Sequence, residues 1–202
     1  MSPRIALISA TPAAIGPAVD ALATEFPRAQ PWNILDDRLL ADVGHSGRTS
    51  ALDDRMRRLI DYAVTGGADG VLLTCSLYGE IAKQTDAPVP VLAPDEAAFD
   101  EALASGHAKV LMVASLASAL SDSTARFEQA AYDKGIDVEV GRVHAPDKLV
   151  ETCRGHAAGW DLVLLAQYSL SPAADELSAA LGLPVVSGPR SAAVRLKAVI
   201  EG

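Results

Sequence analysis

The chain has 202 residues, of which 50% are hydrophobic and 21% are charged, and its formal net charge at pH 7 is −9. This length fits one compact domain or two small, closely packed ones, and the apolar content excludes wholesale disorder. The acidic charge argues against a nucleic-acid or anionic-membrane partner, although backbone N–H groups can still create a local site for an anionic substrate.

No segment of the sequence reads as a targeting or membrane element. The opening MSPRIALISATPAAIG has too short an apolar run for a secretory signal, and no stretch approaches the roughly 18 apolar residues of a membrane helix. Its two cysteines, Cys75 and Cys153, are too far apart for a metal motif or a disulfide framework. We therefore expect a soluble, cytoplasmic protein with reduced thiols and with no membrane or nucleic-acid partner.

The first half predicts strands that alternate with helices. In chain order we expect a strand at Arg4–Ser9, a helix ending at Pro27, a helix from about Ser50 to Gly66, a strand at Gly70–Thr74, a helix to about Thr85 and a short strand at Val89–Ala93. The apolar run of the first strand is typical of buried parallel strands. Ser50 and Asp53 have the spacing of a capping box at the start of the second helix.

The second half repeats this order. We expect a strand at Lys109–Ala114, a helix around Ser123–Lys134, a strand at Val138–Val143, a helix at Asp147–Ala158, strands at Leu162–Ala166 and Pro184–Ser187, and a last helix at Ser191–Glu201. GADGVLLTCSLYGE, from Gly67, is echoed by GWDLVLLAQYSLSP, from Gly159, so Cys75 aligns with Gln167. This pattern predicts an α/β fold of two pseudo-symmetric βα lobes with parallel sheets, the first formed by residues 1–94 and 190–202 and the second by residues 95–189.

Small polar residues follow four of the predicted strands. Ligands of parallel sheets bind outside the carboxyl ends of the strands. The residues at these ends are Thr11, then Thr74, Cys75 and Ser76, then Ser115 and Ser118, then Gln167, Tyr168 and Ser169. Duplication would direct all four ends toward one shared cleft between the lobes, and we expect the active site there.

Cys75 is the strongest catalytic candidate. It follows the apolar run VLL and Thr74 and precedes a predicted helix, whose N-terminus would lower the pKa of the thiol from about 8.5. The alternative is a buried structural cysteine, because Cys is among the residue types most often buried. Cys153 fits that alternative, since it lies four residues after Leu149 on the apolar face of a predicted helix.

Several segments resemble the aspartate/glutamate racemase superfamily, which includes hydantoin and glutamate racemases, maleate isomerase and arylmalonate decarboxylase. The similarity spans nearly the whole chain and rests on ILDDRLL from Ile34, GADGVLLTCS from Gly67, PVLAPDEAAF from Pro90, VLLAQYS from Val163, and LGLPVVSG. It implies two lobes with the active site between them and chemistry without pyridoxal phosphate or metal. In the racemases of this superfamily, each lobe contributes one cysteine, and the two cysteines lie on opposite faces of the substrate carbon.

The chain departs from that pattern at the second cysteine. Gln167 occupies the position, and an amide cannot take a proton near neutral pH. Tyr168 is a candidate second acid, but its reference pKa of about 10 makes it a reluctant base. Three reactions remain open: proton transfer of the racemase or isomerase type with Tyr168 or a substrate group as partner, decarboxylation or lyase chemistry with protonation of one face by Cys75, and cis–trans isomerisation through thiolate addition.

The leading hypothesis is a cofactor-independent, cysteine-based enzyme of racemase or isomerase type that acts on a small carboxylate or amino-acid derivative. A decarboxylase or lyase is one alternative, and a non-catalytic small-molecule binding protein is another. The candidate carboxylate-binding residues are Thr11, Thr74, Ser76, Ser115, Ser118, Gln167 and Ser169. Each hydroxyl could instead cap a helix. The sequence leaves the oligomeric state open, homo-oligomers included.

The remaining polar residues form no convincing set. We expect His45 in an exposed loop, and His144 away from the strand ends, as with the other two histidines. Asp36 and Asp37, in the family-like ILDDRLL segment, are candidates for the edge of the pocket, with turn or capping carboxylates as the default interpretation.

Overall fold

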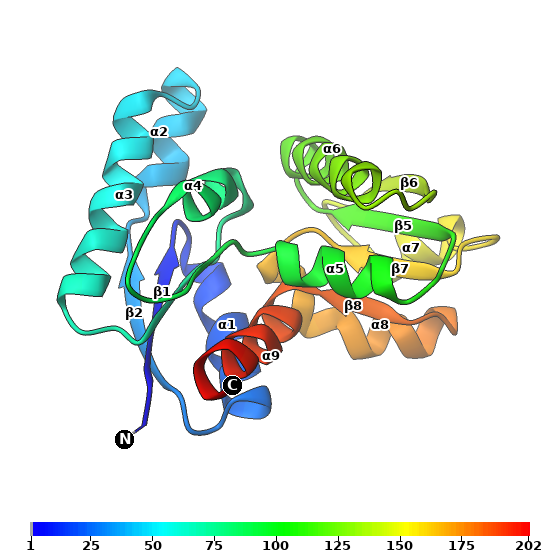
Figure 1. Ribbon diagram of the computed structural model, residues 1–202. Coiled ribbons are helices and arrows are strands. Elements are labelled where there is room, and N and C mark those ends of the chain that lie inside the picture. The colour runs from blue at the N-terminus through cyan, green and yellow to red at the C-terminus, as the bar shows by residue number, and fades with distance from the viewer. Residues whose placement is uncertain (1) are drawn as a thin grey trace. The chain divides into compact units, whose positions relative to one another are not determined.

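A computed structural model describes residues 2–202 and contains two parallel four-stranded sheets with flanking helices (Figure 1). The strand orders are β2-β1-β3-β4 and β6-β5-β7-β8, so both sheets have the same topology. Two compact units result: unit 1 comprises the chain up to Pro94 together with Ala192–Gly202, and unit 2 comprises Asp95–Ser191. The predicted α/β fold with two similar βα lobes and parallel sheets is confirmed.

Unit 1 alternates strands and helices. Its elements, where η denotes a 3₁₀ turn, are β1 (Arg4–Ser9), η1 (Pro12–Ala14), α1 (Ile15–Glu25), β2 (Gln30–Leu35), α2 (Arg38–Ser46), α3 (Ser50–Thr65), β3 (Gly70–Leu73), η2 (Ser76–Tyr78), α4 (Gly79–Gln84) and β4 (Val91–Leu92). The last helix, α9 (Gly188–Glu201), belongs to unit 1 from Ala192 onward.

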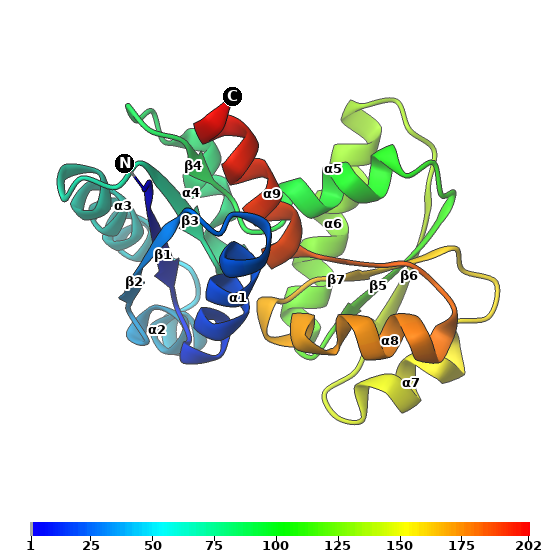
Figure 2. The same ribbon diagram turned by 90° about the horizontal axis from the view of Figure 1, so that it is seen from below.

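Both faces of the first sheet are covered by helices. Ala6 and Ile8 of β1 share a buried cluster with Met56 and Ile60 of α3. On β3, a Cβ at Gly70 would lie 3.0 Å from a methyl carbon of Ile200, so the missing side chain lets α9 pack closely. Figure 2 shows α3 and α1 on opposite sides of this sheet.

Unit 2 follows the same plan. Its elements are α5 (Glu96–Ala104), β5 (Lys109–Ala114), α6 (Ala117–Asp133), β6 (Glu139–His144), α7 (Leu149–His156), β7 (Leu162–Leu165), η3 (Tyr168–Ala173), α8 (Ala174–Leu181) and β8 (Val185–Ser187). Met112 of β5 packs with Phe127 of α6 on one face, and Val113 packs with Leu177 of α8 on the other. Figure 2 shows these two layers, with α5 and α6 on one side and α7 and α8 on the other.

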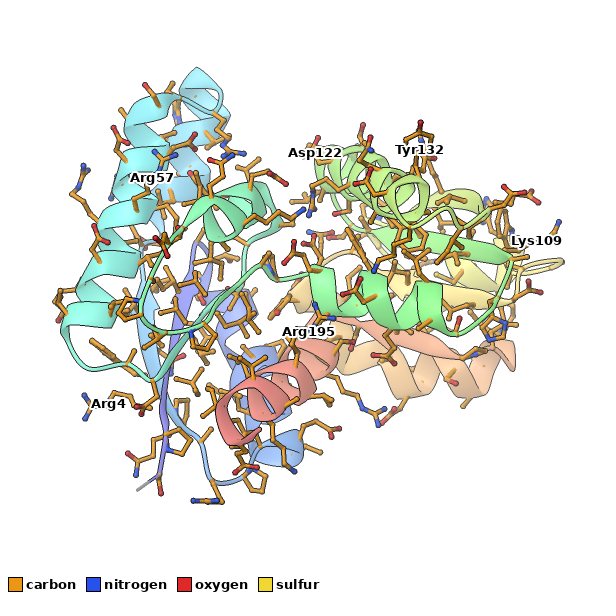
Figure 3. All side chains as sticks on the ribbon, in the orientation of Figure 1. Arg4, Arg57, Lys109, Asp122, Tyr132 and Arg195 are labelled. Atoms are coloured by element: carbon orange, nitrogen blue, oxygen red, sulfur yellow. The ribbon has the colours of Figure 1, made fainter. Side chains whose placement is uncertain are left out.

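The repeat extends to individual hydrogen bonds at the start of the strands. The carboxylate of Asp69 accepts a hydrogen bond from the backbone N–H of Arg4 at 2.7 Å, and that of Asp161 accepts one from Lys109 at 3.1 Å. Each aspartate lies two residues after a glycine with φ of +84° or +85°, a conformation that favours glycine. Arg4 and Lys109 are labelled in Figure 3. The same device therefore fixes the amino end of each sheet.

Two expectations about α3 and α6 are wrong. The N-cap of α3 is Thr49, whose hydroxyl accepts from the N–H of Leu52, while the carboxylate of Asp53 accepts from Arg48. No capping box forms at Ser50, because the helix begins one residue earlier than the box requires. Helix α6 begins at Ala117 and not near Ser123, so the Ser-rich segment is helical.

No helix within residues 2–202 is both long enough and apolar enough to cross a membrane.

Candidate functional site

Cys75 lies directly after β3, at the carboxyl end of the first sheet. It occupies the N-cap position of the turn Ser76–Tyr78 in an extended conformation, with φ −116° and ψ 115°, and its thiol does not cap the turn. The side chain is partly exposed. Cys153, in contrast, is 0% exposed among apolar side chains, and burial raises the pKa of its thiol. The core role predicted for Cys153 is confirmed, and Cys75 is the more accessible thiol.

The helix behind Cys75 is shorter than the sequence predicts. A three-residue 3₁₀ turn follows the cysteine, and α4 is a separate helix of six residues that begins at Gly79. A helix dipole comes from peptide units aligned along one continuous axis. The electrostatic effect of a helix N-terminus on Cys75 is therefore smaller than expected.

Three hydroxyl candidates share this edge, because β1 and β3 are neighbours in the sheet. Thr74 is buried and donates from Oγ1 to the hydroxyl oxygen of Ser9 at 2.9 Å. The hydroxyl oxygen of Thr11 accepts from the N–H of Ala13 at 3.4 Å and caps η1. Ser76 is partly exposed. Thr11 and Thr74 therefore have structural bonds already, and Ser76 lies directly beside the thiol in sequence.

Arg48 holds the turn that carries Cys75. Its Nε donates to the carboxylate of Asp53 at 2.7 Å, and its Nη1 donates to the carbonyl of Leu77 at 2.8 Å. The guanidinium carbon lies 5.7 Å from the centre of the Tyr78 ring. The turn is thus tied to the beginning of α3 by one side chain that the sequence analysis did not select.

Tyr78 is a buried phenol within the same turn. It is 0% exposed, and its hydroxyl donates to the carbonyl of Leu39 at 3.4 Å. Burial, followed by the nearby Cys75 and Asp53, raises the pKa of Tyr78 to about 12, while Arg48 and Arg55 oppose this rise. The phenol is a neutral neighbour of the thiol at physiological pH.

Asp36, which follows β2, has a structural partner. Its two carboxylate oxygens accept from Nε and Nη2 of Arg55 at 2.6 and 2.7 Å. Nη1 of the same arginine donates to Asp42 at 3.2 Å. Asp37 occupies the N-cap position of α2 without a side-chain capping bond. Asp36 therefore contributes to the architecture of the edge through its ion pair with Arg55.

Gln167 occupies, in unit 2, the position that Cys75 has in unit 1. Its side-chain oxygen accepts three hydrogen bonds, from the backbone N–H of Ser115 at 2.6 Å, from the hydroxyl of Ser115 at 3.0 Å and from the N–H of Leu116 at 3.2 Å. The amide is partly buried. Gln167 and Ser115 are therefore brought together, while Ser118 and Ser169 are exposed at the same edge.

Tyr168 lies in an environment that opposes ionisation. The side chain is 5% exposed, and burial, followed by the charge of Asp95, raises the pKa of its phenol well above 10. Asp95 is itself buried and forms a two-pronged ion pair with Arg126, with Nη1 to Oδ1 at 2.7 Å. The phenolate needed for a base is thus strongly disfavoured.

The expectation that His144 lies away from the strand ends is wrong. It is the last residue of β6, its ring is exposed, and Nε2 lies 3.1 Å from the carbonyl oxygen of Ser115. Since a carbonyl only accepts, Nε2 carries the proton in this contact. The predicted strand ending at Val143 already placed a histidine next to the carboxyl edge, and that signal was overlooked. His45, expected in a loop, lies in the last turn of α2.

One hollow in unit 1 is remote from these groups. It has a volume of about 620 Å³ and lies where β1 and β2 begin, lined by Ser2, Pro3, Arg4, Arg28, Gln30, Gly67, Asp69, Ile200 and Glu201. Arg28 pairs with Glu201 at 3.2 Å, and Arg4, seen in Figure 3, donates to the carbonyl of Gly66 at 3.1 Å. This hollow is at the opposite end of the strands from Cys75, so the chemistry of the side chains, and not the size of the hollow, identifies the candidate site. Within residues 2–202, no three His, Cys, Asp or Glu side chains gather closely enough to bind a metal ion.

Comparisons with solved structures give a consistent fold. The aspartate racemase of Picrophilus torridus superposes with a TM-score of 0.77 at 12% identity, covering 98% of this chain and 94% of the racemase. The allantoin racemase of Klebsiella pneumoniae gives a TM-score of 0.67 at 18% identity, with coverages of 99% and 88%. An arylmalonate decarboxylase gives 0.64 at 18% identity, with coverages of 99% and 93%. No family model and no curated protein matches the sequence. The chain therefore shares its fold with these two racemases and with the decarboxylase.

Proposed function

We propose that this protein is a cysteine-based proton-transfer enzyme, in which Cys75 transfers a proton at the carbon next to a carboxylate. The observation that carries the proposal is the partly exposed thiol at the carboxyl end of β3, in a fold shared with racemases and a decarboxylase. The substrate class is a small carboxylate or amino-acid derivative, and the reaction requires no organic cofactor or metal.

The proposed step uses one thiol on one face of the substrate. The Cys75 thiolate removes the proton from Cα, the electron pair moves into an enediolate, and the resulting thiol returns a proton to the same face of that carbon. This step exchanges the proton at Cα and otherwise restores the substrate. Hydrogen-bond donors near the thiol would stabilise the enediolate as its charge develops. Within unit 1, the hydroxyl of Ser76 is the proposed carboxylate donor, whereas Thr11 and Thr74 support the edge through their structural bonds.

Chemistry on a single face is favoured over two-sided racemisation. Gln167 has no proton to exchange near neutral pH, and burial of Tyr168 keeps its phenol protonated. This favours a second candidate reaction, decarboxylation of a malonate-type substrate. Loss of CO₂ leaves the electron pair on the carbon as an enediolate, the S–H of Cys75 donates its proton there, and water reprotonates the thiolate.

Proton exchange in deuterated water tests the proposal. Wild-type protein is incubated with the enantiomers of aspartate and glutamate, with succinate and with methylmalonate, and products are analysed by NMR, chiral chromatography and CO₂ release. We expect deuterium at Cα with retention, or loss of CO₂ with deuterium in the product, and at least a ~100-fold loss of rate in Cys75→Ser, in line with typical contributions of a general acid or base.

Cys153→Ser is the matched control, because it removes the other thiol, which is buried in the core. It should keep the wild-type rate. Deuterium incorporation with inversion would contradict the one-face reaction. Tight binding of a carboxylate without proton exchange and without CO₂ release would instead favour the hypothesis of a non-catalytic binding protein.

A further inference from the structure

We infer that Gln167 presents a fixed N–H donor to a carboxylate oxygen at the carboxyl edge of the second sheet. The residue of unit 2 at the position equivalent to Cys75 would then bind a carboxylate instead of exchanging protons. This inference rests on the proposed function for the presence of a carboxylate, and it assigns a specific atom, Nε2, to its recognition.

The orientation of the amide follows from the groups around it. Two of the three groups within reach of Oε1 are backbone N–H groups, those of Ser115 and Leu116. A backbone N–H can only donate, so the amide oxygen must face it. The flipped amide would place its own N–H₂ against two donors and would lose all three accepted bonds. The nitrogen must therefore point away from the turn between β5 and α6.

The oxygen is held firmly enough to make the nitrogen a preorganised donor. Three accepted bonds of 2.6, 3.0 and 3.2 Å fix one atom of the planar amide. Ser115, which supplies two of them, also accepts from His144 through its carbonyl at 3.1 Å. The amide is thus part of a chain of hydrogen bonds, and such chains polarise and restrain their members.

The nitrogen itself has unused hydrogen-bonding capacity. Among the residues that the structure describes, no atom accepts a hydrogen bond from Nε2 of Gln167. The side chain is partly exposed at the carboxyl edge of the second sheet, beside the exposed Ser169. A carboxylate oxygen suits this donor, because a hydrogen bond to an anion is about twice as strong as a neutral one.

A purely structural role is the competing explanation, since the oxygen alone would cap the start of the 17-residue helix α6. Gln167→Glu separates the two roles. A glutamate keeps an oxygen for the same three donors, and its negative charge near a helix N-terminus is stabilising. It replaces the N–H₂ by a second oxygen, which repels an anion. Gln84→Glu is the matched control, because Gln84 is an exposed residue of α4 and the change adds the same charge.

The test measures the binding of malonate, succinate, aspartate and glutamate by titration calorimetry, together with melting temperatures. We expect at least one carboxylate to bind wild type and to bind Gln167→Glu about 10- to 100-fold more weakly, the range for loss of a hydrogen bond to a charged group. Gln84→Glu should stay within about twofold of wild type, in keeping with the weak screened effect of an exposed charge. The melting temperature of Gln167→Glu should equal or exceed that of wild type.

Three results would overturn the inference. They are undiminished carboxylate affinity in Gln167→Glu, a lower melting temperature of that variant, and no binding of any of these carboxylates to wild type. The assay needs no turnover, so failure of the proposed reaction appears separately, as an absence of Cys75-dependent deuterium exchange in a protein that still binds.

Discussion

Replacing Tyr78 by Phe tests whether the phenol in the Cys75 turn is kept neutral by its surroundings. The pKa of this phenol is about 12 in the folded protein, against 10.0 for the unperturbed side chain. A pKa raised by folding means that the phenol contributes stability fully below pH 10, and that this contribution is lost as the pH rises through 12.

The expected size of the effect at pH 11 follows from these two values. At pH 11, ionisation of the phenol increases the statistical weight of the unfolded state by a factor of about 11 and that of the folded state by about 1.1. The unfolded state is thus favoured by a factor of about 10, which lowers the free energy of unfolding by ~1.4 kcal/mol. At pH 8 the substitution should cost less than ~1 kcal/mol, because the bond to the Leu39 carbonyl is long at 3.4 Å. Wild type should therefore lose about 1.4 kcal/mol more than Tyr78→Phe between pH 8 and pH 11.

Urea unfolding at both pH values, with a reductant present, measures the difference. Other groups that titrate in this range affect both proteins equally and cancel. Tyr132→Phe is the matched control, since Tyr132 is 81% exposed and its removal should leave the pH dependence unchanged. If wild type and Tyr78→Phe lose the same stability between pH 8 and pH 11, burial does not hold the phenol neutral and the argument fails.

Two further predictions concern the scaffold. Asp95→Asn removes one partner of the buried pair with Arg126, and we expect it to lower the free energy of unfolding by about 3 kcal/mol in chemical denaturation; a change below ~1 kcal/mol would contradict the pairing. Gly141→Ala places a Cβ 2.3 Å from the ring of Trp160 and should cost ~1–3 kcal/mol, whereas Gly155→Ala, with open space and a helical backbone, should gain up to ~1 kcal/mol. Similar melting temperatures for these two glycine variants would refute the packing argument.

Strongly patterned elements were predictable, and an edge strand was not. The runs that form β1 and β3 are continuously apolar, and their burial leaves little choice of structure. Strand β2 was missed, because QPWNIL contains a proline and is only partly buried. Its structure depends on pairing with β1 along one edge, which is a tertiary effect that local propensity does not contain. Helix α2, which follows it, was missed as well.

The candidate site was predictable in position but not in its connections. Strand ends gave the locations of Cys75 and Gln167, because the carboxyl ends of parallel strands carry ligand sites. Sequence spacing does not reveal that Arg48, 27 residues before Cys75, donates a hydrogen bond to the Cys75 turn. It also does not reveal that the side-chain oxygen of Gln167 accepts hydrogen bonds from Ser115 and Leu116. Such bonds join segments that are distant in sequence, and only the folded backbone brings them together.

The placement of Asp69 and Asp161 has a consequence for how this chain can change. Both carboxylates fasten the strands at their beginnings, while the reactive candidates stand where the strands finish. The residues that stabilise each sheet and the residues that are candidates for chemistry therefore lie at opposite ends of its strands. A substitution at the carboxyl end of a strand, such as glutamine for cysteine, leaves these aspartate hydrogen bonds in place, so the two units differ in chemistry while keeping one architecture.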